Sequence, residues 1–358
     1  MSDSLVILLT GAFAAVACSL LGTFLLLRGM SLVGDAVSHA VLPGIVVAFL
    51  LTHSVSALPV VLGAAAVGLL TVFLIETLVK TRRVKADASI AIVFPALFAL
   101  GVLLIARFLD QKDLDLDCVL FGEITFAGLD TVRLLGAEVS QPMLVLGGAM
   151  AVNLVFVIAL YKELKLATFD AALASALGIS PVLIHYLLMG AVSVTTVASF
   201  EAIGAVLVVA FLIVPAATAH LLTDRLWLML VLSASIGIAS AATGYAAAMA
   251  LNVSVSGMMA AAMGAFFVMT WLLAPREGVI GRLVARRRAR ERFALALVLA
   301  RLAREPADER ELLSDLAWPR ERLDEVLLAL KRNGLVEPSG QALRPTPMGL
   351  GFLSATAG

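Results

Sequence analysis

The sequence predicts an all-α membrane protein, a polytopic helical bundle followed by a small soluble domain. Hydrophobic residues make up 61% of the chain and charged residues 15%, and the mean hydropathy is +1.03, which is far from the composition of soluble domains. Aromatic residues reach only 6%, while Gly, Ala, Ser and Thr fill many apolar runs. This composition suits close packing of helices in lipid better than a transmembrane barrel.

Nine apolar runs have about the length that crosses a bilayer, roughly 20 mostly apolar residues. Pro43 and Pro181 shorten or interrupt the second and sixth runs, so eight spans and a re-entrant segment are the alternative. The first run contains Asp3 and no basic segment, which indicates a retained span rather than a cleaved signal. The runs lie near residues 5–27, 36–52, 58–79, 90–107, 142–160, 182–199, 202–222, 226–250 and 254–274.

The distribution of Lys and Arg predicts the orientation, because short cytoplasmic loops are enriched in these residues. With the C-terminal tail inside, nine crossings place the N-terminus outside. The outer segments then hold three basic residues, Arg107, Lys112 and Arg133. The inner loops hold eight, namely Arg28, Lys80, Arg82, Arg83, Lys85, Lys162, Lys165 and Arg225.

A run of arginines marks the border between the membrane domain and the tail. We expect a transmembrane domain over residues 1–282, a basic juxtamembrane linker over 283–290 and a cytoplasmic domain over 291–358. The linker is expected to face anionic membrane lipid. The run consists of Arg282, Arg286, Arg287, Arg288 and Arg290.

Residues 291–358 predict three helices followed by a short hairpin and a closing turn. Helical periodicity is present in "RFALALVLARLA", "ERELLSDLA" and "PRERLDEVLLALKRNGLV". Pro319 suits a first helical turn, and Asn333 with Gly334 suits a helix end. The remainder, "EPSGQALRPTPMGLGFL", fits the hairpin and turn, so the whole has a winged-helix pattern.

The charges of this tail do not favour nucleic acid as a partner. Residues 291–358 contain nine Lys and Arg against ten Asp and Glu, a net charge of −1, whereas a duplex binder usually presents a basic face. The tail also lacks His and Cys. We expect an interaction module there.

Asp35 and His39 are the ionisable residues of the second apolar run, in "SLVGDAVSHAVLPG". Four residues apart, they share one face of a helix, where a carboxylate oxygen and an imidazole nitrogen can converge. Such a pair offers a divalent transition metal half of a binding site, and a symmetric second subunit could supply the other half. Ionisable residues inside a membrane are candidates for function by default.

The same pair has a structural alternative. Asp35 follows Gly34 and could cap the start of a helix, as Asp often does, and His39 could be a buried hydrogen-bonding side chain. Residue chemistry alone does not separate these interpretations.

Other ionisable residues near the ends of spans are weaker candidates. Glu201 could line a substrate path at the outer end of its span, although a Glu at the membrane interface costs little. His185 and His220 fall near inner helix ends, where a structural role is favoured. Glu76 lies one turn from the inner border and can reach toward Lys80.

Alternating acids mark "DQKDLDLDCVLFGEITF", residues 110–126. Asp113, Asp115 and Asp117 resemble the start of a calcium loop, but the later Gly and Glu of such a loop are not at the required positions. The segment is expected to be an outer loop whose acids raise the local cation concentration.

Residues 161–180, "YKELKLATFDAALASALGIS", are the longest polar interruption between spans on the inner side. A short helix with Asp170 near its start and Gly178 at its end could dock into a groove of a cytosolic partner; an ordinary amphipathic connector is the alternative. The chain has no G-x-x-x-x-G-K-[ST] phosphate loop. We therefore expect no ATP hydrolysis by that route from this chain, and any ATP-driven work must come from another polypeptide.

Four blocks of sequence resemble the permease subunits of the ABC importers for manganese, zinc and iron. The resemblance covers residues 5 to about 282, with the blocks in family order. It implies a helical bundle related to the vitamin B12 type of importer, working as a dimer of permeases with two cytosolic ATPases and an extracytoplasmic metal-binding protein. The blocks are "RGMSLVGDAVSHAVLPGIV", "DLDLDCVLFGEI", "YKELKLATFDAALASALGIS" followed by "HYLLMGAVSVTTVASFEAIG", and "VLVVAFLIVPAATAHLLTDR".

The resemblance also implies roles for particular residues. The family's metal-contacting acid and histidine fall on Asp35 and His39, and Glu201 lies in a family block without an assured role. The ATPase-coupling helix of the family falls within Phe169 to Ser180, which makes Phe169, Asp170 and Gly178 candidates for coupling.

The tail departs from the plain permease pattern. Its stretch "GLVEPSGQALRPTPMG" is similar to the winged-helix domain of iron-dependent repressors. The missing His and Cys argue against carrying over the metal sites of those repressors.

We therefore predict a multi-pass permease of a bacterial-type cell membrane that imports a divalent transition metal by alternating access, powered by a separate ATPase. Manganese is favoured over zinc or iron, and no permanently bound cofactor is expected. Two other classes are kept as alternatives, a secondary metal transporter and a membrane-tethered metal-responsive regulator.

Overall fold

The structure is a computed structural model of the 358-residue chain. The chain divides into two compact units, Met1–Leu272 and Leu273–Gly358, called the membrane unit and the tail unit below. Asp113, Asp115 and Asp117 lie outside the described residues, so their placement in an outer loop stays a prediction. The structure describes residues 3–52, 57–108, 123–128, 131–134, 137–274, 278–339 and 342–357.

In the described part of the chain, nine segments are long and apolar enough to cross a membrane, which confirms the predicted number. The second of them consists of two helices, α2 (Ser31–Ala40) and α3 (Leu42–Thr52). The others are α1 (Asp3–Leu27), α4 (Ala57–Lys80), α5 (Ala86–Phe108), α7 (Gln141–Ala159), α10 (Pro181–Ile203), α11 (Ala205–Leu222), α12 (Leu226–Leu251) and α13 (Val255–Leu273).

The boundaries of several spans differ from expectation by a few residues. The second span starts at Ser31 rather than near residue 36, because the small residues Ser31 and Gly34 dilute the apolar pattern of its first turn. Pro181 stands in the first turn of α10 instead of interrupting it. A proline is tolerated there, since the N–H it lacks would have no partner within the helix.

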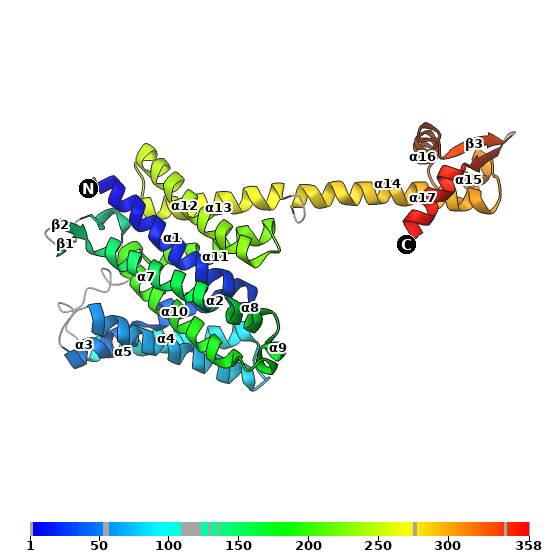
Figure 1. The fold of residues 1–358 in the computed structure, drawn as a ribbon. Coiled ribbons are helices and arrows are strands. Elements are labelled where there is room, and N and C mark those ends of the chain that lie inside the picture. Colours follow the sequence, from blue (N-terminus) through cyan, green and yellow to red (C-terminus); the bar gives the residue numbers. More distant parts are fainter. Residues whose placement is uncertain are drawn as a thin grey trace. The chain divides into compact units, whose positions relative to one another are not determined.

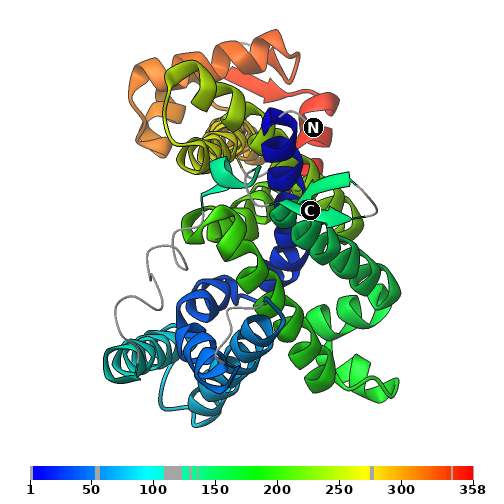
Figure 2. The ribbon, with the colours of Figure 1, turned by 90° about the vertical axis from the view of Figure 1, so that its left-hand side faces the viewer.

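The membrane unit has two layers of helices. In one layer α1 packs against α7, α11 and α12, and in the other α3, α4 and α5 pack together with α2 (Figure 1). α10, drawn green, runs between them, with contacts to α2 and α4 on one side and to α1 and α7 on the other (Figure 2). α10 is therefore placed to connect the two layers.

Small and weakly polar residues hold the helices of this unit together. Asn153 of α7 is buried and donates hydrogen bonds to the carbonyl of Ala17, at 3.2 Å, and to Thr195, at 2.8 Å. Thr23 and Ser233 join α1 to α12 through a hydroxyl pair 3.2 Å apart. Close approach of backbones and hydrogen bonds of this kind are the usual basis of helix association in membranes.

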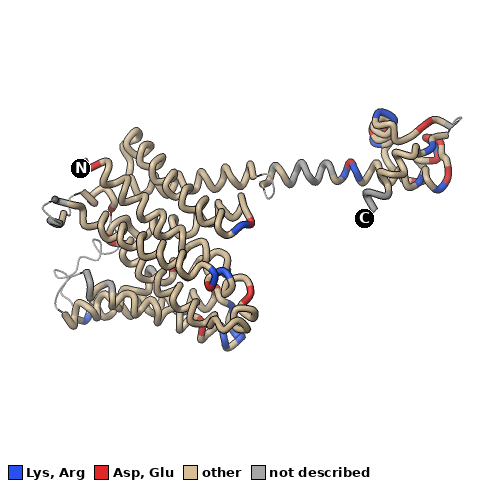
Figure 3. Tube along the Cα trace, viewed as in Figure 1, with Lys and Arg blue, Asp and Glu red and all other residues tan. Residues whose placement is uncertain are grey.

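The basic residues of the membrane unit gather mainly at one end of its helices (Figure 3). α8 (Tyr161–Phe169) and α9 (Ala171–Ala176) lie at the same end. We call it the basic end. By their positions in the chain, these basic residues are Arg28 after α1, Lys80 in the last turn of α4, Arg82, Arg83 and Lys85 between α4 and α5, Lys162 and Lys165 in α8, and Arg225 directly before α12.

A hairpin that the sequence did not predict lies toward the opposite end (Figure 1). Its strands are β1 (Thr131–Leu134) and β2 (Ala137–Ser140), with Thr131 opposite Ser140, and the short helix η1 (Ile124–Phe126) precedes it. Ser140 ends the hairpin and caps α7, because its hydroxyl accepts a hydrogen bond from the backbone N–H of Met143 at 3.3 Å.

The tail unit contains the predicted three helices and hairpin. They are α14 (Val279–Arg304), α15 (Glu309–Leu316), α16 (Arg320–Arg332), β3 (Val336–Ser339) and β4 (Ala342–Pro345). Asp308 and Glu311 form a capping box at the start of α15. As expected, α16 ends before Asn333 and Gly334, whereas Pro319 is its N-cap rather than a residue of its first turn.

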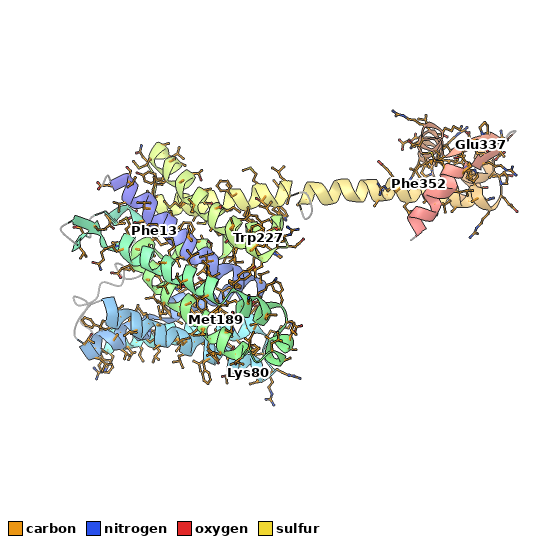
Figure 4. All side chains as sticks on the ribbon, in the orientation of Figure 1. Phe13, Lys80, Met189, Trp227, Glu337 and Phe352 are labelled. Atoms are coloured by element: carbon orange, nitrogen blue, oxygen red, sulfur yellow. The ribbon has the colours of Figure 1, made fainter. Side chains whose placement is uncertain are left out.

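One expectation for the tail is wrong. The expected closing turn is an 11-residue helix, α17 (Pro347–Ala357). It packs on α14, and Phe352 of α17 is labelled in Figure 4. The predicted basic linker covers residues 283–290. The side chains of residues 282–288 lie outside the described part of the chain, so most of this linker is not tested.

Candidate metal site

A break in the second span sets the position of the candidate metal site. α2 ends at Ala40, Val41 is a turn residue and α3 begins at Leu42. Pro43 explains the break, because proline has no N–H to donate to the carbonyl of His39, its partner in a continuous helix. Interrupted helices are a recurring way in which transporters bring backbone and side-chain groups to an ion.

Asp35 and His39 lie on α2 directly before this break. His39 Nε2 is 3.7 Å from Asp35 Oδ1, and the side chains of His39 and Asp35 are 38% and 42% exposed. The imidazole packs near two rings of α5, with centroid distances of 6.1 Å to Phe94 and 6.5 Å to Phe98. The pair is therefore supported from α5 and is partly open to its surroundings.

This geometry suits two ligands of one divalent ion. Metal–ligand bonds of about 2.0 to 2.2 Å allow two donor atoms of one ion to lie up to about 4.4 Å apart, so a separation of 3.7 Å fits. Within the described residues no group of three or more His, Cys, Asp or Glu side chains could hold a metal ion. The described residues of one chain thus provide one carboxylate and one imidazole, which is half of a typical four-ligand site.

The structural alternative for Asp35 is wrong. The N-cap position of α2 is Met30, so Asp35 lies inside the helix and does not cap it. His39 is also partly exposed rather than buried.

Glu201 and His220 stand apart from this pair. Glu201 is exposed near the end of α10, and His220 is exposed near the end of α11. Among the described residues, no hydrogen bond or ion pair joins Glu201 to Asp35 or His39.

The connector at the basic end contains the short helix that the sequence predicted. Asp170 caps α9, since its Oδ1 accepts a hydrogen bond from the backbone N–H of Leu173 at 2.9 Å. Gly178 ends the segment with φ +81°, a left-handed conformation that glycine adopts without strain. Phe169, Leu173 and Leu177 are 59%, 46% and 62% exposed.

Sequence reasoning missed a polar cluster at the same end. Glu76 contacts Lys80 at 3.4 Å, as expected, but it also accepts a hydrogen bond from Tyr186 at 2.8 Å and lies 2.7 Å from His185 Nε2. Glu76 and Tyr186 are 110 residues apart in the chain, so no local pattern pairs them. The one available signal was that the sequence places all these residues near span ends on the predicted inner side.

In the described part of the chain, nine segments are long and apolar enough to cross a membrane, and an acid and an imidazole lie beside a break in one of them. This combination is typical of a polytopic α-helical transport protein. Residues 4–274 match the family model described as the ABC 3 transport family. Because this match covers well over half of the chain, the chain belongs to that family.

Known proteins similar to this chain include two curated relatives and one solved structure. The manganese transport system membrane protein MntD of Bacillus subtilis is 49% identical over 275 residues, 76% of this chain and 93% of MntD. The zinc transport system membrane protein TroD of Treponema pallidum is 36% identical over 357 residues, 98% of this chain and 97% of TroD. TroD therefore aligns with the tail unit as well as with the membrane unit.

The solved structure is titled PsaBC from Streptococcus pneumoniae in complex with Fab. Its matching chain is 31% identical in sequence, with a TM-score of 0.65, and the match covers 77% of this chain and 94% of that chain. The fold of the matched part of this chain is thus shared with a solved relative.

Proposed function

We propose that this chain is the permease subunit of an ABC importer and that its substrate is a divalent transition metal. The observation that carries the proposal is the Asp35–His39 pair, placed beside a helix break in the membrane unit of an ABC 3 family chain. The relatives named above are manganese and zinc transport proteins. The family match and the named relatives do not support either alternative, a secondary transporter or a membrane-tethered regulator.

Manganese is the substrate that we favour. Oxygen and nitrogen ligands without a thiolate suit Mn²⁺ and Fe²⁺ at least as well as Zn²⁺, although affinity alone rises from Mn²⁺ to Zn²⁺. The 49% identical relative is a manganese transport protein, whereas the relative that aligns along the whole chain is a zinc transport protein. Selection among metals is therefore expected to depend partly on the protein that delivers the ion.

A second permease subunit is proposed to complete the site. Two ligands from each of two chains give a four-ligand site, and the partial exposure of Asp35 and His39 leaves them accessible to a partner. Two ligands per subunit also favour moderate affinity, which release of the ion requires. An extracytoplasmic metal-binding protein is the expected source of the ion.

The basic end is proposed to face the cytoplasm, in line with the enrichment of Lys and Arg on that side of membranes. The N-terminus is then extracytoplasmic, and the tail unit follows the last span on the cytoplasmic side. α9 lies at the basic end, where a cytosolic ATPase could reach it. Movement of the ATPases on binding ATP would reach the spans through residues 169–180.

The exposed apolar side chains near α9 make this docking testable. We expect the double variant Phe169→Ala/Leu173→Ala to reduce capture of the ATPase subunit at least about tenfold, because buried apolar anchors commonly contribute more than about 1 kcal/mol each. The measurement is the amount of ATPase that co-purifies with equal amounts of permease in detergent.

Val152 and Val155 provide a matched control. They are 67% and 66% exposed on α7, a membrane-crossing helix, and Val152→Ala/Val155→Ala should leave ATPase capture unchanged. Equal capture by wild type and by Phe169→Ala/Leu173→Ala would reject α9 as the docking helix.

For the tail unit we propose a winged-helix interaction module rather than a nucleic-acid binder. Three helices and the hairpin β3–β4 fit that arrangement. The exposed side chains of α16 carry both signs of charge, including Arg320, Glu321 and Asp324, and such a mixed surface disfavours a duplex.

A further inference from the structure

Four side chains at the basic end form a continuous set of contacts between α8 and α4. Arg28 Nε donates a hydrogen bond to Thr168 Oγ1 at 3.1 Å, and Arg28 Nη1 lies 3.3 Å from His185 Nδ1. His185 Nε2 in turn lies 2.7 Å from Glu76 Oε1. We call Arg28, Thr168, His185 and Glu76 the polar clamp.

The contacts define how His185 carries its proton. An arginine nitrogen can only donate, so His185 Nδ1 must accept from Arg28, and the neutral ring then carries its hydrogen on Nε2, facing Glu76. The other carboxylate oxygen of Glu76 accepts a hydrogen bond from Tyr186 at 2.8 Å. His185 therefore lies between a positive group and a negative group. Its accepting nitrogen faces the Arg28 guanidinium, and its N–H faces the Glu76 carboxylate.

The clamp is incompletely satisfied in this conformation. Arg28 Nη2 and His185 Nε2 are buried, and neither makes a hydrogen bond within the described part of the chain. His185 Nε2 is thus 2.7 Å from Glu76 Oε1 without the alignment of a hydrogen bond. Buried donors without acceptors are rare, and a small movement of α4 or α10 would be enough to align His185 Nε2 with Glu76 Oε1.

A metal site is a poorer explanation of the cluster. Glu76 is the only carboxylate in the clamp; it contacts the cation Lys80, and the cation Arg28 contacts the other side of His185. Burial lowers the pKa of the Arg28 guanidinium, but arginine stays protonated in proteins. A divalent ion would therefore meet two positive charges and one negative charge.

The position of the clamp links the connector to the metal-bearing helix. Thr168 is the residue before Phe169, where α8 ends, and α9 follows at once. Arg28 lies in the turn between α1 and α2, where Gly29 has φ +68° and the N–H of Met30 bonds to the carbonyl of Leu25 at 2.9 Å. A movement of Thr168 thus reaches the start of α2 through one side chain.

We propose that the polar clamp positions α2 and α4 relative to the α8–α9 connector and so transmits the movement of the ATPase to the metal site. This inference rests on the proposed function, because it requires an ATPase docked near α9. The clamp residues are positioning residues and do not contact the metal.

The test measures the number of ATP molecules hydrolysed per Mn²⁺ ion taken up by the assembled complex in proteoliposomes. We expect Glu76→Gln and Arg28→Gln to raise this ratio about tenfold, equivalent to roughly 1.4 kcal/mol of lost coupling, while assembly and ATP hydrolysis stay within about twofold. Thr168→Val removes the acceptor of Arg28 Nε, together with a local hydrogen bond to the carbonyl of Leu164 within α8, and should raise the ratio at least about threefold. The double variant Arg28→Gln/Glu76→Gln should be no worse than either single variant, since both act through one set of contacts.

Lys80→Gln is the matched control. Lys80 contacts the same carboxylate, but its side chain is 72% exposed, and an exposed ion pair contributes little, so the ratio should not change. A wild-type ratio in Thr168→Val and Glu76→Gln, or an equal rise in Lys80→Gln, would overturn the proposal. If Glu76→Gln and Arg28→Gln do not assemble, the ratio measured for Thr168→Val alone tests the proposal. Absence of ATP-driven uptake by wild type would instead reject the proposed function, and the clamp with it.

Discussion

Asp35→Ala and His39→Ala are each expected to reduce metal uptake at least about 100-fold in an assembled complex that still hydrolyses ATP. Each variant removes one of the two ligands that a chain offers, and even loss of an outer-shell partner of a metal ligand costs roughly 10- to 100-fold in affinity. The measurement is uptake of Mn²⁺, Zn²⁺ and Fe²⁺ at matched protein levels. Folding should be unaffected, because both side chains are partly exposed.

Two other positions serve as controls for this prediction. Asp87 is exposed in the first turn of α5, and His220 is exposed near the end of α11. Asp87→Ala and His220→Ala should retain most of the uptake. Near-normal uptake in both Asp35→Ala and His39→Ala would mean that the transported ion does not bind to this pair.

Gly22→Ala is expected to have the largest effect on stability. A Cβ atom at Gly22 would overlap the carbonyl oxygen of Leu212 and lie 2.7 Å from its carbonyl carbon. Because these atoms belong to the backbone of α11, no side-chain rotation relieves the overlap, and α1 and α11 must move apart. We expect the free energy of unfolding to fall by about 3 kcal/mol or more, measured by denaturation in detergent.

Gly148→Ala in α7 is the corresponding control. No heavy atom lies within 4 Å of a Cβ atom built there, so this variant should be as stable as wild type or more stable by up to about 1 kcal/mol. Equal stability of Gly22→Ala and Gly148→Ala would contradict the close packing of α1 against α11.

The number of spans and the shared face of Asp35 and His39 could be predicted from the sequence, because both follow from local rules. A run of apolar residues gives the length of a span, and a separation of four residues gives a common helix face. Pro43 likewise explained an irregular second span. The positions of span ends were less exact, as at Ser31, since small residues are neutral in hydropathy.

The features that sequence reasoning missed depend on tertiary contacts or on short segments. The pairing of Glu76 with His185 and Tyr186 joins two distant helices, and hydropathy carries no information about that pairing. The hairpin β1–β2 has only four residues in each strand, which is too short for a clear alternation. α17 was mistaken for a turn because "PMGLGFLSATA" contains two glycines and little helical periodicity.

ATP-dependent metal uptake by the wild-type chain is the most direct test of its function. The chain, with its ATPase subunits and partner permease, would be reconstituted in proteoliposomes, and accumulation of Mn²⁺, Zn²⁺ and Fe²⁺ measured with and without ATP on the ATPase side. We predict accumulation that requires ATP, persists when a protonophore removes the proton gradient, and is greatest for Mn²⁺. Accumulation that needs a proton gradient but no ATPase would contradict the proposal and indicate a secondary transporter.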